Sequence, residues 1–193
     1  MITISLITGN PGKLKEFRHA LEPLGFRVMH LPEEVDEIQA DTLEGVVGAC
    51  IKELKGRGLN NFVLDDSGLF VNALRGFPGV YSSYVFKTLG SDGILRLLKD
   101  EKDRNASFRC CIGCSLETVG EFAVTEEAQG TIIGEKRGTG GFGFDPIFRP
   151  LGFEQTFAEM PLDRKNEISH RGKAIRRFAS VLGERREVLR DAP

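Results

Sequence analysis

The sequence predicts an α/β protein built on a mixed β-sheet. Short apolar runs typical of strands alternate with stretches in which apolar residues recur every three or four positions, the period of an amphipathic helix. Near the middle of the chain, residues 106 to 133 alternate apolar and polar side chains over a length that suits an antiparallel hairpin. The chain has 193 residues, so we expect one domain that spans residues 1 to 193.

The first predicted strand, residues 2 to 8, leads directly into a helix. Asn10 is a residue type that caps helices, and Pro11 suits the first helical turn. Gly25 ends this helix, and residues 26 to 31 predict a second strand. One face of the helix is expected to be buried through apolar residues spaced by three and four: Leu14, Phe17, Leu21 and Leu24.

A second helix is predicted after an acidic stretch at residues 33 to 41. Asp41 followed by Glu44 resembles a capping box with an aspartate cap. Residues 62 to 64 then predict a strand that runs into Asp65 and Asp66, and residues 69 to 71 continue its apolar character. The buried stripe of the second helix is expected to comprise Leu43, Val46, Val47, Cys50, Ile51 and Leu54.

The second half of the chain predicts two helices, a hairpin and a last helix. Helical patterns occur near residues 81 to 89 and 91 to 99, and strands are expected at 106 to 117 and 121 to 133. A glycine-rich loop follows. The last helix is predicted to begin near His170 and to bury Ala174, Ile175, Phe178, Ala179 and Leu182.

Composition narrows the function classes. Lys and Arg number 26 against 28 Asp and Glu, a net charge of -2, so we expect no nucleic-acid partner, which would favour a basic excess. The sequence has no apolar run long enough to span a membrane, and its first residues lack the pattern of a signal peptide. The four cysteines are consistent with reduced thiols, and we expect a cytoplasmic protein.

The cysteines do not predict a zinc site. On a strand, Cys111 and Cys114 point to opposite faces, whereas Cys110 and Cys114 share a face but lie about 13 Å apart. Neither pair suits tetrahedral zinc, so we expect buried core cysteines.

The segment "TGNPGK" joins the first strand to the first helix. It is not a Walker loop, because its glycines are too close together and Leu14 stands where that loop has a hydroxyl residue. A helix N-terminus nevertheless attracts anions. Lys13 is a cation in the first helical turn, where the helix dipole makes it unfavourable, and a phosphate bound between Lys13 and the helix N-terminus would remove this conflict. The alternative is an ordinary capped turn with a solvated lysine, and local sequence favours neither.

The segment "DDSG" places two carboxylates at the end of an apolar strand, where α/β sheets often bind ligands. Because neighbouring strand residues face opposite sides, we expect one of Asp65 and Asp66 to act directly and the other to support it. Glu37 and Asp66 could share a magnesium ion, which takes carboxylates and substrate phosphates as ligands. A turn-forming Asp-Ser-Gly and a solvated acidic loop are the plainer alternatives.

Two later segments suggest recognition of a nucleobase. In "GFGFDP", Phe142 or Phe144 could stack on a base, and Asp145 could accept hydrogen bonds from base N–H groups. In "SHR", His170 and Arg171 could donate to a carbonyl. The alternatives are a glycine-rich hairpin with core phenylalanines and a structural histidine.

Seven segments together resemble one family, the inosine triphosphate pyrophosphatases, also called XTP/dITP diphosphatases. The match "GFGFDP" followed at this distance by "SHR" is the most specific, and the segments come in the family's order from residue 3 to about 180. They are "TGNPGK", "EIQ", "DDSGLFV", "FPGVYS", "GTGGFGFDPIF", "TFAEM" and "ISHRGKA".

The resemblance implies a long mixed β-sheet flanked by helices, in two lobes with a central cleft. It implies an enzyme that hydrolyses ITP, dITP and XTP to the monophosphate and pyrophosphate and so cleanses the nucleotide pool. Mg²⁺ would be the cofactor, the nucleotide the small-molecule partner, and the assembly a homodimer.

The resemblance also assigns roles to residues. Glu37 and Asp66 match the metal ligands, and Asp66 matches the catalytic residue that activates water. The substrate-binding positions correspond to Thr8, Gly9, Asn10, Pro11, Gly12, Lys13, Lys52, Ser67, Phe142, Gly143, Phe144, Asp145, Lys165, His170 and Arg171.

Two other functions remain open from the sequence. A non-catalytic nucleotide sensor would bind ITP without hydrolysing it. A phosphomonoesterase would use Asp65 or Asp66 as its nucleophile.

Overall fold

The computed structural model describes residues 2–35 and 38–190. Its strands and helices follow the predicted order closely, and the α/β class is confirmed. The strands are β1 (Ile2–Ile7), β2 (Phe26–Leu31), β3 (Phe62–Val71), β4 (Pro78–Gly79), β5 (Asn105–Leu116), β6 (Gly120–Ile132) and β7 (Phe148–Pro150). The helices are α1 (Pro11–Leu21), α2 (Leu43–Gly56), α3 (Ser82–Thr88), α4 (Gly90–Leu97), α5 (Leu162–Ile168) and α6 (His170–Arg190).

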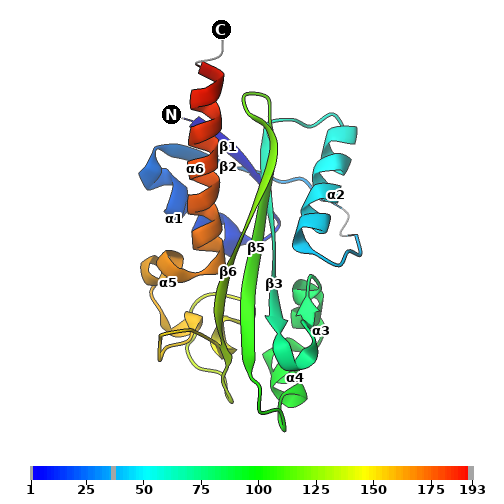
Figure 1. Ribbon diagram of the computed structural model, residues 1–193, viewed down its shortest axis with the longest axis vertical. Coiled ribbons are helices and arrows are strands. Elements are labelled where there is room, and N and C mark those ends of the chain that lie inside the picture. The colour runs from blue at the N-terminus through cyan, green and yellow to red at the C-terminus, as the bar shows by residue number, and fades with distance from the viewer. Residues whose placement is uncertain (1, 36–37, 191–193) are drawn as a thin grey trace.

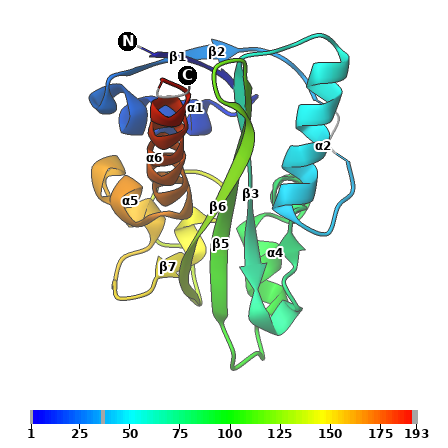
Figure 2. The same cartoon turned by 45° about the horizontal axis from the view of Figure 1, so that its top comes forward.

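The strands form one mixed sheet in the order β2-β1-β3-β5-β6-β7, with β4 paired to β3. Strand β1 is parallel to β2 and β3, whereas β3, β5, β6 and β7 pair antiparallel in turn. Both views show α1, α5 and α6 on one side of the long β5–β6 hairpin and α2 and α4 on the other (Figures 1 and 2). Strands β3, β5 and β6 therefore connect two lobes.

Apolar residues pack on both faces of the sheet. Cys110 and Cys114 lie in the core cluster that faces α6, and Cys111 lies in the cluster that faces α2. All four cysteines are free and buried, which confirms the expectation of core residues. Helix α2 packs closely: a Cβ on Gly113 would lie 2.3 Å from Val47 Cγ1, so glycine is required there. The predicted stripe of α2 is buried throughout.

Two predictions about helix ends are wrong. Helix α2 is capped by Thr42, whose Oγ1 accepts a hydrogen bond from Gly45 N at 3.1 Å, and not by Asp41. Leu24 is 55% exposed and does not extend the buried face of α1. Helix α1 ends at Leu21, and the chain tightens into a 3₁₀ turn around Pro23, whose ring disfavours continuing the helix; this turns Leu24 outward.

Strand β3 carries its acidic residues without a break. It runs for 10 residues through Asp65 and Asp66 instead of turning at them.

In the described part of the chain, no helix is both long and apolar enough to cross a membrane.

Candidate active site

A cavity of about 550 Å³ lies in the cleft between the two lobes. The β1–α1 loop, the middle of β3, helix α3, the loop before β7 and the start of α6 all contribute to its wall. It gathers most of the predicted site: Thr8, Gly9, Asn10, Pro11, Lys13, Asp65, Asp66, Ser67, Phe142, Gly143, Phe144, Asp145, Lys165, His170 and Arg171.

Three predicted residues are not placed on this cavity. Lys52 lies on the exposed side of α2, away from the buried stripe, and is absent from the cavity wall. Gly12 is also absent from the wall; its α-carbon faces Phe142, and an added Cβ would come within 2.6 Å of that ring. Glu37 lies outside the described residues.

The β1–α1 loop is held by its own side chains. Asn10 Oδ1 accepts hydrogen bonds from Gly12 N at 2.8 Å and Lys13 N at 3.4 Å, and Asn10 N donates to Thr8 Oγ1 at 3.1 Å. The prediction that free helix N–H groups would meet an anion is therefore not realised for these three amides. Lys13 is the cationic side chain that this loop brings to the cavity wall.

Lys13 reaches across to β3. Its Nζ donates to the backbone oxygen of Asp65 at 2.9 Å and lies 3.2 Å from Asp65 Oδ2. The unfavourable position of this cation at a helix N-terminus is thus offset by a carboxylate of the neighbouring strand.

Asp65 and Asp66 separate as the strand geometry predicts. Asp65 stands opposite Ile112 of the α6-facing core, whereas Asp66 stands opposite Cys111 of the α2-facing core. Burial raises the pKa of Asp65, but Lys13 and Arg171 together outweigh this and hold that pKa below its usual value. Asp65 is a buried, ionised support.

Asp66 is the better placed of the two to meet a ligand. It is only partly buried, it lines the cavity, and Ser67 N donates to its Oδ1 at 2.9 Å. Asp65 Oδ2, in contrast, already accepts from Ser67 Oγ at 3.1 Å and from Arg171 Nε at 3.1 Å. A role as water-activating base therefore suits Asp66.

A buried ionic network forms the floor of the cleft. Glu16 accepts from Lys165 Nζ at 2.7 Å and from Arg171 Nη1 at 2.6 Å. Lys165 also donates to Asp145 Oδ2 at 2.7 Å, and Arg171 Nη2 donates to Ser67 Oγ at 2.7 Å. Burial lowers the pKa of Lys165, but Asp145 and Glu16 reverse this and raise it, so its ammonium stays charged.

Glu16 is a site residue that the sequence analysis missed. It follows Lys13 by three positions and precedes the buried Phe17, so it lies on the inner side of α1. A charge at the edge of an apolar stripe is usually solvated, and its buried partners come from residues about 150 positions later.

The two candidate stacking rings have different environments. Phe142 is half-buried, with Lys165 Nζ 4.9 Å and the Arg171 guanidinium carbon 5.3 Å from its ring centre. Phe144 is buried and packs edge-on against Phe86, with ring centres 5.3 Å apart. Phe142 therefore remains available to a flat ligand, whereas Phe144 belongs to the core.

One carboxylate oxygen of Asp145 is engaged within the protein. Its Oδ2 accepts from both Lys165 Nζ at 2.7 Å and Phe142 N at 2.8 Å. Asp145 thus fixes the loop that carries Phe142.

His170 is a buried residue of the cavity wall. Its ring stacks on Phe108, with centres 4.7 Å apart and planes 10° from parallel. Burial, together with the charges of Arg171 and Lys165, holds the pKa of His170 well below 6.5, so the imidazole is neutral. Its Nδ1 is buried without a hydrogen-bond partner in the described structure, which leaves it for a ligand.

The donors that the described residues offer a metal are few but chemically suitable. Their His, Cys, Asp and Glu side chains form no group of three or more that could hold an ion. Asp66 offers a carboxylate on the cavity wall, whereas Glu33, also on the wall, is paired with Arg57. Hard divalent cations such as Mg²⁺ are usually bound by one or two carboxylates together with substrate phosphates, and not by a closed set of protein ligands. A single carboxylate on the cavity wall is compatible with that kind of site.

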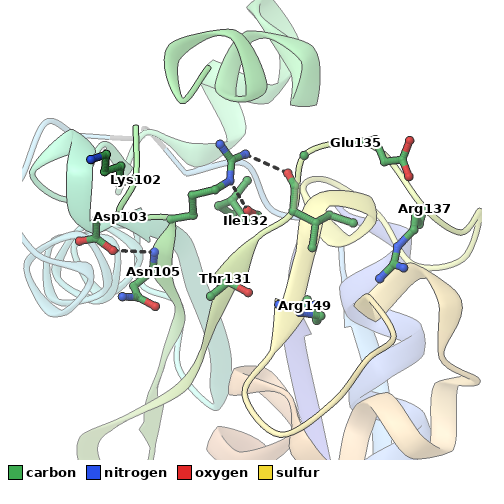
Figure 3. A pocket seen from close by; sticks show the side chains of 11 residues that line it. Lys102, Asp103, Asn105, Thr131, Ile132, Glu135, Arg137 and Arg149 are labelled. Atoms are coloured by element: carbon green, nitrogen blue, oxygen red, sulfur yellow. Dashed lines mark hydrogen bonds between the residues drawn. The ribbon is translucent and has the colours of Figure 1, made fainter. Parts of the chain in front are cut away.

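A larger hollow of about 940 Å³ lies away from these residues, between the ends of the β5–β6 hairpin and the loop before β7 (Figure 3). Arg104, one of its lining residues, donates to the backbone oxygens of Leu98, Ile132 and Ile133 at 2.7–3.0 Å. That guanidinium ties the segment after α4 to the end of β6, a structural role, and the cleft remains the candidate site.

The chain is similar to known proteins over most of its length. The model of the Ham1 family matches residues 4–181. The chain is 53% identical to the dITP/XTP pyrophosphatase of Thermococcus kodakarensis, over 94% of this chain and 97% of that one. It is 48% identical to the dITP/XTP pyrophosphatase of Pyrococcus horikoshii, over 91% and 94%.

Solved structures are similar over nearly the whole chain. The Ham1 protein of Staphylococcus aureus aligns with a TM-score of 0.80 at 28% identity, covering 94% of this chain and 98% of that one. A HAM1 protein from Coxiella burnetii aligns with a TM-score of 0.79 at 32% identity, covering 95% and 100%.

Proposed function

The chain belongs to the Ham1 family, and on this premise we propose that it hydrolyses the non-canonical purine nucleoside triphosphates ITP, dITP and XTP. The products are the nucleoside monophosphate and pyrophosphate, so the enzyme cleanses the nucleotide pool. The observation that carries the proposal is that one cavity holds Lys13, Asp66, Phe142 and His170. Together they provide a cation for phosphates, a carboxylate for water, a ring for stacking and a neutral polar group for the base.

The metal is proposed to be Mg²⁺, held by Asp66, by Glu37 and by the substrate's phosphates. Bound there, Mg²⁺ would neutralise phosphate charge and favour departure of pyrophosphate. This donor set follows from oxygen chemistry and from the resemblance at Glu37.

In the proposed mechanism, Asp66 orients a water molecule toward the α-phosphorus and accepts a proton from it. The water oxygen attacks the α-phosphorus, and pyrophosphate leaves. Lys13 stabilises negative charge on the phosphate chain, moving from Asp65 toward the substrate as it binds. Asp65 and Arg171 keep the β3 segment and Ser67 in register beneath the reacting group. Positioning and charge stabilisation supply most of the rate enhancement in phosphoryl transfer.

Base selection is proposed to depend on hydrogen bonding rather than on stacking. Phe142 can stack on any purine, whereas a donor to the 6-oxygen distinguishes hypoxanthine and xanthine from adenine. His170 Nδ1 is the proposed donor, in the tautomer that carries the ring proton on that nitrogen, because the nitrogens of Arg171 already donate to Asp65, Glu16 and Ser67. Pockets that lose such a hydrogen bond can reject an analogue by about 10⁴-fold.

The two alternative functions have less support. The names of the relatives and the accessible Asp66 both argue against a non-catalytic sensor. A phosphomonoesterase would need an unencumbered nucleophile, and Asp65 is surrounded by Lys13, Arg171 and Ser67.

Product analysis tests the proposal. The protein is incubated with ITP, XTP, ATP or GTP and Mg²⁺, and the phosphorus products are identified. We expect monophosphate and pyrophosphate from ITP and XTP and little turnover of ATP and GTP. Orthophosphate would indicate a phosphatase, and binding without any product would indicate a sensor.

Homodimer formation is carried forward as a proposal from the resemblance, and a cytoplasmic location as a proposal from the free cysteines. Light scattering on the purified protein tests the first, with a mass twice the 21.3 kDa of the chain expected. Fractionation of the source cells tests the second.

A further inference from the structure

The charges already present in the cleft leave few cations for a phosphate chain. The partly buried Lys13 and the buried Lys165 and Arg171 are matched by three carboxylates, Glu16, Asp65 and Asp145. A network that is neutral as a whole attracts a polyanion weakly unless one of its pairs opens. Besides the Mg²⁺ proposed above, an unpaired cation at the cleft would therefore strengthen the binding of a nucleoside triphosphate.

Lys87 supplies a cation that is not engaged in this network. It stands in the last turn of α3 and lines the cavity together with its neighbours Ser83 and Phe86. Its side chain is exposed, and within residues 2–35 and 38–190 it makes no ion pair or side-chain hydrogen bond. The ammonium is therefore free to meet a ligand without first leaving a carboxylate.

Helix α3 approaches the cavity from a different side than the β1–α1 loop. It follows β4, which pairs with the second half of β3, whereas Lys13 lies in the first turn of α1 and contacts Asp65 in the first half of β3. Phe86 beside Lys87 packs edge-on against the buried Phe144, so α3 is fixed to the loop that carries Phe142. A cation near the C-terminal end of a helix is also favoured by the helix dipole.

We propose that Lys87 binds the phosphate chain of the nucleotide from the α3 side of the cleft, as a second cation in addition to Lys13. This inference rests on the proposed function, because it assumes a ligand with several phosphates. A cation available without an opening step would attract the substrate first, and Lys13 would then exchange Asp65 for phosphate. A solvated surface lysine with no role in binding is the alternative that the experiment must separate.

The test compares Lys87→Ala and Lys87→Arg with Lys99→Ala. Lys99 is an exposed lysine just after α4, on the same side of the sheet as α3, and it is absent from the cavity wall. Steady-state hydrolysis of ITP and competitive inhibition by inorganic tripolyphosphate are measured for each variant with Mg²⁺ present. Tripolyphosphate reports phosphate binding alone, because it has no base.

We expect Lys87→Ala to raise both KM for ITP and the inhibition constant of tripolyphosphate by about tenfold. This is the change expected when one charge-assisted hydrogen bond to the phosphates is lost. The turnover number should change by less than about threefold, since the interaction is made in both the ground and transition states. Lys87→Arg should restore most of the affinity, and Lys99→Ala should leave both constants unchanged.

Unchanged constants in Lys87→Ala, or an equal change in Lys99→Ala, would overturn the inference. Calorimetric titration of the wild type and Lys87→Ala with tripolyphosphate gives the same comparison without turnover. If the wild type failed to hydrolyse ITP, the proposed function would fail, while this titration would still decide whether Lys87 binds phosphates.

Discussion

Glu16 and Arg171 lie 155 positions apart in the sequence, and a hydrogen bond of 2.6 Å joins them in the floor of the cleft. Glu16 belongs to α1 and Arg171 to the first turn of α6. The same carboxylate accepts from Lys165 of α5 at 2.7 Å, so a single side chain connects three helices beneath the site. Its removal should therefore affect both the stability of the fold and the geometry of the cleft.

Replacing Glu16 with Gln removes the shared carboxylate but nearly preserves its shape. Two buried cations would then be poorly compensated, and breaking such a pair typically costs about 3–5 kcal/mol. We expect a decrease of that size in the free energy of unfolding, measured with urea. Glu127→Gln is the matched control, because that carboxylate pairs with Arg109 at the surface and should contribute less than about 1 kcal/mol. Equal effects of the two substitutions would contradict the account.

Phe142→Ala and Phe144→Ala should have opposite signatures. Phe142 lines the cavity half-buried, so its loss should weaken ITP binding, by about 1–3 kcal/mol if the ring stacks on the base, with little effect on unfolding. Phe144 is only 3% exposed, and its loss should destabilise the fold by about 3–5 kcal/mol. Calorimetric titration and urea unfolding of both variants make the comparison. A weaker binding effect for Phe142→Ala than for Phe144→Ala would reverse the assignment of the stacking ring.

The neutral state of His170 predicts a pH dependence of stability. Its folded pKa lies well below 6.5, whereas the unfolded chain has the ordinary value. As pH falls below about 6.5, the unfolded state binds a proton that the folded state does not, so stability decreases by up to about 1.4 kcal/mol per pH unit until the folded pKa is reached. The His170→Gln variant should lack this decrease in the free energy of unfolding at low pH. Unfolding curves at several pH values between 7.5 and 5.5 measure it, and parallel pH profiles for wild type and variant would refute it.

Asp66→Asn and Asp65→Asn distinguish the acting carboxylate from the supporting one. Loss of a positioned general base typically reduces turnover by about 10²–10⁴-fold, so Asp66→Asn should be nearly inactive yet still fold and bind ITP. Asp65→Asn should instead lower the free energy of unfolding, because Lys13 and Arg171 lose a buried counter-charge. Near-normal hydrolysis by Asp66→Asn would exclude the role assigned to it.

The sequence predicts those elements in which local pattern and burial agree. The six-residue stripe of α2 is found in the structure, because its pattern has only one way to bury its apolar side chains. The expected alternation of β5 is not seen in its burial, because α2 and α6 cover the strand on both faces. The alternation of Asp65 and Asp66 follows from strand geometry alone. The Asn10 cap is also local, because its partners are two and three residues away.

Interactions between distant segments were beyond local reasoning. No residue near Glu16 in the sequence indicates that Lys165 and Arg171 will form ion pairs with it. Likewise, no residue near Lys13 indicates that its ammonium will form an ion pair with Asp65. The free state of Lys87 could not be inferred either, since it depends on which carboxylates the fold places elsewhere. Leu24 is a smaller case: its helical spacing was correct, but Pro23 ends the helix before it.

The position of bond cleavage tests the central claim most directly. The enzyme hydrolyses ITP with Mg²⁺ in water enriched in the heavy isotope of oxygen, and the isotope content of IMP and pyrophosphate is measured by mass spectrometry. If water guided by Asp66 attacks the α-phosphorus, the label appears in IMP and the pyrophosphate remains unlabelled. Label in pyrophosphate, or release of labelled orthophosphate, would place the attack at another phosphorus and contradict the account.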